Sequence, residues 1–535
     1  MRRAILILLC AAGLLAAQPV TVTLLATTDL HGNLVPVDYV TGQPVARGLA
    51  KIATLIRQAR GGHPGALLID CGDTIQGTPL EGVYQSMVRT GADEVGHRPA
   101  AKLLGDPMMR AMNLLGYDAM TVGNHEYNVG LANLAKARQD ARFPWISANT
   151  AVAAGGAERA FAGYIVKAVG GVKVAVIGIT TPVIPMWERA ENLGAYRFLP
   201  PIEAVRTAVA KLRQEERPDV IVVAAHSGLG RNLQTGAAEE PEENVVYRLA
   251  EQVPELDAIV FGHSHAQLEG QLAGKVLLVQ PKNGGASLAR IDFTLDRRPA
   301  GGWAVVGKKS RLIPVTPQTA AARDVMELAK PYEDAAERYL DTPVATSVKE
   351  LSATRGRDED TAVVDLVQRV QLFCAKADVS FTALFNPEVR IPQGQVTVRQ
   401  IAALYPYDNE LLAIEGTGKM VKDALENAAR YFSGNGMPGF NYDMAAGVEY
   451  EIDRSRPEGD RIRNLSWRGK PLAPERQLRI AINNYRAGGS GGYTMFRGAK
   501  VVWRSGEDIR ELLIRYYTER QAIPGEATGN WKMVR

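Results

Sequence analysis

Cysteine is scarce in this chain of 535 residues, which contains only three. Cys10 falls in an N-terminal apolar stretch, while Cys71 and Cys374 are far apart in the sequence, in what we expect to be different domains. Such a pattern does not build a disulfide framework, so the fold must depend on hydrophobic cores. The length favours two or more domains, and we expect two.

Net charge is also small. The formal charge is +4, and loss of Arg2 and Arg3 with the N-terminal segment would leave 60 basic against 58 acidic residues. A chain this balanced has no global field for a nucleic acid polymer or an anionic membrane, so neither is an expected partner. The hydrophobic content of 46% is ordinary for a globular protein.

A long hydrophobic run occurs at the N-terminus, in "MRRAILILLCAAGLLAAQPV". Two arginines precede an apolar stretch that ends at Leu15, and small residues follow up to Ala17. This layout predicts a signal peptide over residues 1–17, with cleavage near Ala17. The stretch is short for a membrane span, and a short membrane anchor is the alternative. We expect a periplasmic or secreted protein without a stable membrane anchor.

Between residues 20 and 300, short apolar runs recur, and each ends in polar residues. The runs are "VTVTLLATTDLHGN", "ALLIDCGDTIQG", "DAMTVGNHEYN", "DVIVVAAHSG" and "DAIVFGHSH". Amphipathic segments such as "PPIEAVRTAVAKLRQEE" lie between them. This alternation of strand and helix patterns predicts a layered α/β domain. Polar residues beyond the strand ends should then converge in space, although they are far apart in the sequence.

The polar residues at these strand ends are of the kinds that bind metals. They are Asp29, His31, Asp73, Asn124, His125, His226, His263 and His265. One such histidine is more often structural, but this set contains five of the seven histidines. Imidazole and carboxylate together are ligands for divalent transition metals. The set is too large for one tetrahedral ion, so we expect two ions with Asp73 bridging them.

Taken together and in order, the motifs at the strand ends resemble the calcineurin-like metallophosphoesterase pattern. They are "DLHGN" (29–33), "GD" (72–73), "GNHE" (123–126), "HS" (226–227) and "GHSH" (262–265). The resemblance implies a first metal held by Asp29, His31, Asp73 and His265, and a second held by Asp73, Asn124, His226 and His263. His125 is then no ligand. In the family this histidine lies over the metal pair and stabilises the transition state or the departing oxygen.

The C-terminal half contains "LYPYDNEL" (404–411) and "INNYRAGGSGGY" (482–493), which resemble the nucleotide-binding domain of the bacterial 5′-nucleotidase family. In that family two aromatic rings clamp the base, and the matching positions are Tyr407 and Tyr485. The alternative is that both tyrosines are core or turn residues. Asn409 matches a position that contacts the base, and Arg390 in "FNPEVRIPQG" resembles an arginine that contacts nucleotide or phosphate.

The resemblance covers nearly all of the mature chain and implies its domain organisation. After the signal peptide, residues 18–315 form a calcineurin-like domain, a four-layer α/β sandwich. Residues 316–345 form a helical interdomain linker that Pro331 bends or divides. Residues 346–535 form the α/β substrate-binding domain of the 5′-nucleotidase family.

Asn128 is a marker of one branch of this family. The 5′-nucleotidase branch has an aspartate three residues after the catalytic histidine, whereas "GNHEYN" places Asn128 there. A carboxylate favours the imidazolium form, while an asparagine orients the ring without supplying charge. This departure resembles the bifunctional 2′,3′-cyclic-nucleotide 2′-phosphodiesterase/3′-nucleotidase branch. So do "DTIQGTPL" (73–80), "HSGL" (226–229) and "MPGFNYD" (437–443).

The resemblance implies an exported, dinuclear-metal phosphoesterase of nucleotide catabolism. It would convert 2′,3′-cyclic nucleotides to 3′-nucleotides and then to nucleosides and phosphate. A metal-bound hydroxide would attack phosphorus while His125 steadies the developing charge. The alternatives are a 5′-nucleotidase or nucleotide-sugar hydrolase, and a secreted nucleotide-binding protein without catalysis. The ligand set accepts two ions of Zn, Mn, Fe or Co. Nucleotides are the expected partners, and we expect a monomer.

Overall fold

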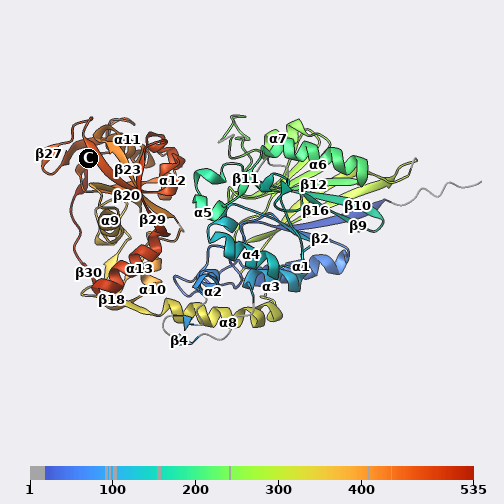
Figure 1. Ribbon diagram of the computed structural model, residues 1–535, viewed down its shortest axis with the longest axis horizontal. Coiled ribbons are helices and arrows are strands. Elements are labelled where there is room, and N and C mark those ends of the chain that lie inside the picture. The colour runs from blue at the N-terminus through green and yellow to red at the C-terminus, as the bar shows by residue number, and fades with distance from the viewer. Residues whose placement is uncertain are drawn as a thin grey trace, which may run out of the picture.

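The computed structural model describes residues 19–534, apart from residues 91–93, 96–97, 100–104, 153–157, 240–241, 300, 408 and 435. The predicted signal peptide lies outside the described residues. Within them the chain forms two α/β halves connected through helix α8 (Arg323–Leu340) (Figure 1). In this described part, no helix combines the length and the apolar character needed to cross a lipid bilayer.

The N-terminal half contains a first sheet of six strands in the order β17-β16-β1-β2-β5-β6. Their bounds are β1 (Val20–Thr27), β2 (Leu67–Asp70), β5 (Ala119–Thr121), β6 (Trp145–Ile146), β16 (Ser287–Arg297) and β17 (Trp303–Pro314). Strands β1, β2, β5 and β6 are parallel neighbours, while β16 pairs with β1 in the antiparallel sense. The carboxyl ends of β1, β2 and β5 therefore lie along one edge of the sheet.

A second sheet of six strands has the order β14-β15-β13-β12-β10-β9. Their bounds are β9 (Tyr164–Val169), β10 (Val172–Thr180), β12 (Val220–His226), β13 (Ala258–Phe261), β14 (Leu268–Ala273) and β15 (Val276–Gln280). Strands β10, β12, β13 and β15 are parallel. This sheet contributes the remaining predicted ligands, from the ends of β12 and β13.

The two sheets pack face to face. Apolar residues from both sheets form one buried cluster between them, including Leu24, Ile69, Val176, Val222 and Val260. Strands buried on both faces read as nearly continuous apolar runs, which explains why "DVIVVAAH" shows little alternation. The predicted ligand residues lie at the carboxyl ends of these strands, beyond the apolar cluster.

Helices cover the outer face of each sheet. Helices α1 (Leu49–Gly62) and α3 (Pro107–Leu115) pack on the first sheet, and α6 (Pro201–Glu215) and α7 (Val246–Gln252) pack on the second. In α6 the buried residues recur at helical spacing, as Ile202, Val205, Val209 and Leu212. Helix, sheet, sheet and helix make four layers (Figure 1), which confirms the predicted architecture.

The predicted helical connector contains Pro331 in its interior. Of the two effects expected of this proline, division of the helix does not occur, because α8 continues through it, while the bend stays a prediction. Proline has no backbone N–H to donate within a helix, and α8 packs against helices of the N-terminal half along its length. The side chain of Tyr332 is fully buried, and its hydroxyl donates to the carbonyl oxygen of Gly105 at 2.7 Å. Arg57 also forms a bidentate ion pair with Asp324.

The C-terminal half is built around a five-stranded sheet with the order β24-β20-β28-β23-β29. Their bounds are β20 (Val379–Ala383), β23 (Glu410–Thr417), β24 (Asp443–Ala446), β28 (Gln477–Asn483) and β29 (Val501–Asp508). Helices α9 (Ala362–Ala375), α11 (Gly418–Ala429) and α13 (Ile509–Arg520) pack against it. This arrangement confirms a second α/β unit, and it places the short helix α12 (Asn484–Ala487) directly after β28.

Candidate active site

The ends of five strands from both sheets meet at one edge of the N-terminal sandwich. Residues after β1, β2 and β5 come from the first sheet, and residues at the ends of β12 and β13 come from the second. Their side chains form two groups, and within each group the possible ligand atoms lie within 4.8 Å of one another. The groups are Asp29, His31 and His265, and Asp73, His226 and His263.

The first group brings two ring nitrogens and a carboxylate oxygen close together. His31 Nε2 lies 2.9 Å from His265 Nε2, and His265 Nε2 lies 3.5 Å from Asp29 Oδ1. The other nitrogen of His31, Nδ1, lies 3.1 Å from the carbonyl oxygen of Gln76, which favours a proton on Nδ1 and leaves Nε2 free. Two nitrogens that bind one ion at about 2.1 Å stand roughly 3 Å apart when they are at right angles. The spacing therefore fits two ligands of one cation.

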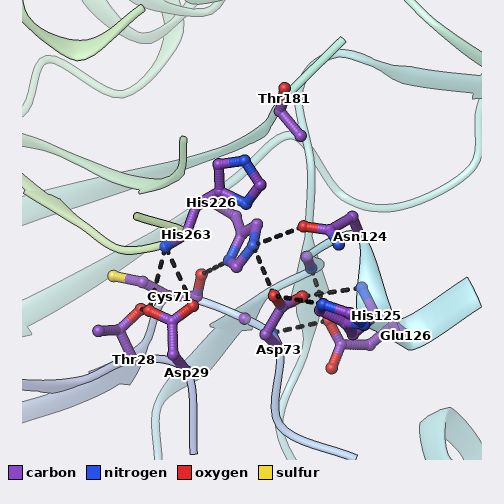
Figure 2. Close-up of polar contacts among 12 residues, drawn as sticks. Thr28, Asp29, Cys71, Asp73, Asn124, His125, Glu126, Thr181, His226 and His263 are labelled. Carbon is purple, nitrogen blue, oxygen red and sulfur yellow. Dashed lines mark hydrogen bonds and ion pairs between the residues drawn. The ribbon is translucent and has the colours of Figure 1, made fainter. Parts of the chain in front are cut away.

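The second group is arranged in the same way around His226. Figure 2 shows its ring between Cys71 and Asp73. His226 Nδ1 lies 2.8 Å from the carbonyl oxygen of Cys71, while Nε2 lies 2.9 Å from Asp73 Oδ2 and 3.0 Å from Asn124 Oδ1. The amide oxygen of Asn124 thus joins this group. Asp73 Oδ1 also accepts a hydrogen bond from the backbone N–H of His125 at 2.8 Å.

Glycines next to the ligand motifs allow this close packing. A Cβ atom at Gly123 would collide with Asp73 Oδ1 and lie 2.9 Å from His226 Nδ1. At Gly262 it would collide with Thr28 and with Asp29 Oδ2. Close approach of side chains to the backbone therefore requires glycine in "GNHE" and "GHSH".

The backbone at this edge is strained. Ten non-glycine residues among those described have positive φ, and five of them are predicted ligands. These five are Asp29 (48°), His31 (46°), Asp73 (58°), His263 (71°) and His265 (53°). Each such residue costs of order 1–3 kcal/mol and persists where the surrounding structure enforces it, typically at functional sites.

Burial and mutual charge shift the pKa values of the cluster residues. Burial by itself would raise the pKa of Asp73, but His226, His125 and His31 outweigh it and hold that pKa well below its usual range. Although burial opposes the charge, Asp73 raises the pKa of His226 to about 10. Burial lowers the pKa of His31 to about 4. Two buried, ionised carboxylates among imidazoles form a donor set that suits divalent transition metals.

Glu126 and Glu243 support the cluster, and neither role was predicted from the sequence. The Glu126 carboxylate accepts hydrogen bonds from the backbone N–H groups of Gly123 (2.6 Å), Asp73 (2.9 Å) and Thr74 (2.7 Å), which joins two of the loops. Glu243 Oε1 lies 2.7 Å from His263 Nε2. A carboxylate on the outer nitrogen of a ligand histidine fixes its ring orientation.

His125 stands beside the cluster on a 3-10 turn (His125–Tyr127). Its Nε2 lies 3.9 Å from Asp73 Oδ2, and its ring centroid lies 5.2 Å from that of His31. On the other side of the ring, Nδ1 is hydrogen-bonded to Asn128 Oδ1. The amide of Asn128 in turn donates to Glu188 Oε2. Glu188 has no motif around it, and the sequence did not reveal it.

The two candidate clamp residues lie in the C-terminal half and are exposed. The side chains of Tyr407 and Tyr485 are 45% and 38% accessible, so they are not core residues. Tyr407 meets Phe385 edge to face at 5.0 Å, and Arg486 lies 5.3 Å from the ring centroid of Tyr485. Burial raises the pKa of Tyr407 and the charge of Arg486 partly offsets this, so both rings are within the electrostatic range of Arg486.

The other two predicted contacts are placed differently. Asn409 Oδ1 accepts a hydrogen bond from the hydroxyl of Tyr405 at 3.3 Å, next to Tyr407. Arg390 forms an exposed ion pair with Glu350 at 3.2 Å. Asn409 is therefore beside the candidate clamp, while Arg390 would have to leave Glu350 in order to meet a phosphate.

A contact between the halves connects the clamp with the metal-ligand cluster. The ring of Trp187 stacks on His263 with centroids 5.7 Å apart, and the Trp187 carbonyl accepts a hydrogen bond from Asn484 Nδ2 at 3.0 Å. Asn484 begins α12, the helix that carries Tyr485. Figure 1 shows α12 facing the short helix α5 (Ala190–Leu193), which follows Trp187.

Two family models match the chain. The calcineurin-like phosphoesterase model matches residues 22–267, and the model of the 5′-nucleotidase C-terminal domain matches residues 341–498. Together they span both halves of the structure and agree with its two α/β units.

Curated relatives match over nearly the whole chain. The trifunctional nucleotide phosphoesterase protein YfkN of Bacillus subtilis is 28% identical over 97% of this chain, which spans only 39% of the length of that protein. The 2′,3′-cyclic-nucleotide 2′-phosphodiesterase/3′-nucleotidase of Salmonella typhimurium is 29% identical, with 97% of this chain and 89% of the relative covered.

Solved structures share the fold. A Staphylococcus aureus protein crystallised with alpha-ketoglutarate has a TM-score of 0.81 at 26% identity, covering 96% of this chain and all of that one (100%). The calcineurin-like phosphoesterase YfkN structure from Bacillus subtilis is 30% identical, with a TM-score of 0.52, and covers 60% of this chain and 99% of its own. The predicted family and enzyme class are confirmed: the chain belongs to the calcineurin-like phosphoesterases with a 5′-nucleotidase C-terminal domain, a family of metal-dependent hydrolases.

Proposed function

We propose that this protein is an exported nucleotide phosphoesterase that converts 2′,3′-cyclic nucleotides to 3′-nucleotides and then to nucleosides and phosphate. The observation that carries the proposal is the contact of α12, which bears Tyr485, with Trp187, whose ring stacks on His263. It brings a surface suited to a nucleobase next to a cluster suited to a phosphate. Asn128 and the Salmonella relative favour the cyclic-nucleotide branch.

Seven residues would hold two divalent ions, in the two sets implied by the family resemblance. They are Asp29, His31, Asp73, Asn124, His226, His263 and His265. When bound, the ions neutralise the phosphate charge and act as Lewis acids on the phosphoryl oxygens. Nitrogen and oxygen ligands of these kinds accept Zn, Mn, Fe or Co, so the residue types in the ligand set do not select one metal.

His125 would act on the phosphate group itself. Its Nδ1 is occupied by Asn128, so Nε2 is the atom that faces the cluster and Asp73. Because Nδ1 keeps its hydrogen for Asn128, Nε2 can take up a proton, and the resulting imidazolium can donate that proton to an oxygen that gains charge as the P–O bond breaks. Because the ring is held from behind, little reorganisation is needed at the moment of reaction.

The C-terminal half would hold the nucleoside. The exposed rings of Tyr407 and Tyr485 can stack on either face of a base, which contributes about 1–3 kcal/mol per contact and tolerates base identity. Asn409 would contact the edge of the base, and Arg390 would contact the nucleotide or its phosphate.

The wider organisation is also a proposal. We infer a signal peptide over residues 1–17, a catalytic domain over 18–315, a linker over 316–345 and a substrate-binding domain over 346–535. The protein would act as a monomer in the periplasm or outside the cell, on nucleotides rather than nucleic acid polymers.

A second candidate is a 5′-nucleotidase or nucleotide-sugar hydrolase. It is favoured by relatives such as the 5′-nucleotidase of Vibrio vulnificus, which is 27% identical over 94% of this chain. A nucleotide-binding protein without catalysis is disfavoured, because every residue of the predicted ligand set is present and the side chains converge.

The deciding experiment is a substrate panel with purified protein loaded separately with Mn²⁺ and Zn²⁺. The substrates are 2′,3′-cyclic AMP, 3′-AMP, 5′-AMP and a nucleotide sugar. We expect kcat/KM to be highest for 2′,3′-cyclic AMP, with 3′-AMP next and 5′-AMP at least tenfold lower. A preference for 5′-AMP or the sugar nucleotide would replace the proposal by the second candidate.

A further inference from the structure

Three side chains form a continuous row behind the catalytic candidate. His125 Nδ1 is hydrogen-bonded to Asn128 Oδ1, and Asn128 Nδ2 donates to Glu188 Oε2. All three residues are half-buried. The row runs away from the metal-ligand cluster and ends in a carboxylate from a segment 60 positions after Asn128.

Glu188 is held in place by further donors. Its Oε1 accepts hydrogen bonds from the backbone N–H of Arg189 at 2.7 Å and from Asn192 Nδ2 at 2.8 Å. Asn192 Nδ2 also donates to the carbonyl oxygen of Asn128 at 3.0 Å. Both oxygens of the carboxylate therefore face donors, which is the environment of an ionised, acceptor-only group.

An acceptor at this position determines how Asn128 is turned. A carboxylate cannot donate, so the NH₂ group of Asn128 must face Glu188 and its carbonyl oxygen must face His125. The ring nitrogen that meets this oxygen must then carry a hydrogen, which fixes Nδ1 as the protonated nitrogen. Nε2 is left directed toward Asp73 and the cluster. A neutral residue in place of Glu188 would remove this constraint, because an amide can flip.

We propose that Glu188 is a positioning residue for His125, acting through Asn128. Glu188 fixes the tautomer and orientation of the His125 ring. It also supplies, through Asn128, the negative charge that an aspartate in place of Asn128 would supply directly. This assignment rests on the proposed role of His125 in phosphoester hydrolysis, within the function proposed above. The row therefore replaces a histidine–aspartate pair by a histidine–asparagine–glutamate row.

The position of Glu188 also connects the row to the other half of the molecule. Its neighbours Trp187 and Arg189 both contact the C-terminal half, since the Trp187 carbonyl accepts from Asn484 and Arg189 Nη1 donates to the carbonyl oxygen of Gly506 at 2.5 Å. The segment that carries Glu188 is thus held on both sides. This docking explains how an irregular segment can keep a carboxylate in register with Asn128.

The test exchanges the amide and the carboxylate between positions 128 and 188. Four proteins are compared: the wild type, Glu188→Gln, Asn128→Asp, and the double variant Asn128→Asp/Glu188→Gln. Asn128→Asp alone places two carboxylates face to face without a donor, and we expect kcat to fall about a hundredfold. Glu188→Gln should lower kcat about tenfold with KM within about twofold, because the ring loses its fixed orientation rather than its substrate contacts.

The double variant is the decisive protein. The new glutamine can donate to the new aspartate, which can accept from His125 Nδ1, so the row is restored with its charge moved one residue closer. We expect kcat within about threefold of the wild type. A double variant no more active than Asn128→Asp, or Glu188→Gln with wild-type kcat, would overturn the proposal. Glu191→Gln, an exposed residue on the adjacent helix α5, is the matched control and should leave kcat unchanged.

A second readout reports the tautomer without any turnover. Proteins labelled with ¹⁵N-histidine are compared in metal-free and Zn²⁺-loaded forms by long-range ¹H–¹⁵N spectra, with His125→Asn used to assign the signal. We expect the Nδ1-protonated pattern for His125 in the wild type and the double variant, and a mixture of tautomers in Glu188→Ala. A purely structural role for Glu188 would leave the tautomer unchanged in Glu188→Ala.

Kinetics are measured with bis(4-nitrophenyl) phosphate as well as with 2′,3′-cyclic AMP. If the wild type cleaves the aryl diester but no nucleotide, the proposed nucleotide function fails while the variants still test the row. If the nucleotide function holds and the four proteins do not follow the expected order, the row alone fails.

Discussion

Asp29, Asp73 and His226 are at most 1% exposed, whereas the rings of Tyr407 and Tyr485 are 45% and 38% exposed. The first set lies at the ends of central strands, with strained backbone at both aspartates. Tyr407 lies in the segment after helix α10 (Val398–Ala402), and Tyr485 lies on the short helix α12. The two halves thus present their functional side chains under opposite conditions of burial and strain.

This difference follows from what each half would bind. The charged side chains that would bind metal must be held close together away from water. Their burial costs free energy, which a rigid framework and an opposite charge must offset. A base binds by stacking on a ring, and an exposed ring needs no such compensation. Mutations of the predicted metal ligands should therefore abolish activity. Mutations of the two tyrosines should weaken substrate binding in smaller steps.

The largest effect is expected for Asp73→Ala, because this carboxylate would serve both ions. We expect kcat to fall more than a thousandfold and the bound metal to drop below two ions per chain. Activity assays and elemental analysis of the purified variant measure both. Asp334→Ala, which removes an exposed partner of Lys330, is the control. Two fully occupied sites in Asp73→Ala would contradict the bridging role.

His125→Ala should separate catalysis from metal binding. The ring lies beside the cluster and is not among the predicted ligands, so we expect nearly full metal content with kcat reduced about a hundredfold or more. The same elemental analysis and activity assay apply. A variant that loses metal in parallel with activity would place His125 in the ligand set instead.

The clamp should respond through substrate affinity. Tyr407→Ala and Tyr485→Ala should each raise KM for 2′,3′-cyclic AMP about tenfold, since one stacking contact is worth about 1–3 kcal/mol. Hydrolysis of bis(4-nitrophenyl) phosphate should change less than about twofold. Replacement by phenylalanine retains the ring and is the matched control. Unchanged KM in both alanine variants would remove the clamp from the mechanism.

Burial in the N-terminal half should also appear in the pH dependence of stability. Burial raises the pKa of Asp70 from 3.8 to about 7, although Thr27, Thr74 and Gly72 donate hydrogen bonds to it. A carboxyl with a higher pKa in the folded state binds more protons when folded, so stability falls as pH rises from about 4 to about 7. The expected slope from this group is at most about 1.4 kcal/mol per pH unit.

Asp70→Asn, which replaces the carboxyl by a neutral group of the same shape, should flatten this slope. Urea unfolding of EDTA-treated protein at pH 5, 6, 7 and 8 measures it. In the C-terminal half, burial raises the pKa of Asp365 to about 6, so Asp365→Asn should act over a narrower and more acidic range. Equal slopes in the wild type and Asp70→Asn would show that Asp70 is ionised throughout.

The smallest effect is expected at Arg390. Its ion pair with Glu350 is exposed on both sides, at 61% and 60%. Arg390→Ala should raise KM for 2′,3′-cyclic AMP about threefold. Glu350→Ala, which frees Arg390, should not raise it. A KM unchanged in Arg390→Ala would exclude this residue from substrate binding.

Much of this molecule could be predicted from local patterns. Apolar runs that end in Asp, Asn or His predicted both the α/β sandwich and the residues that converge at its edge, because strands in parallel sheets have their carboxyl ends on the same side. Of the two effects predicted for Pro331, division of the connector does not occur, since a propensity rule does not include the packing of Tyr332 against the N-terminal half. The roles of the converging residues stay predictions.

The sequence by itself determined which residues form the ligand motifs and that they follow strand ends. Each motif occupies one short loop, so the chain around it sets the local backbone conformation. The resemblance also predicted Asn128 as a residue that orients His125, and the two side chains are in contact. Only the tertiary structure decided that Asn128 is backed by Glu188, that Glu243 faces His263, and that Asn484 meets Trp187. These partners come from irregular segments or from the other half, and hydrogen bonds between them are set by how layers and halves pack. No spacing in the sequence encodes that packing.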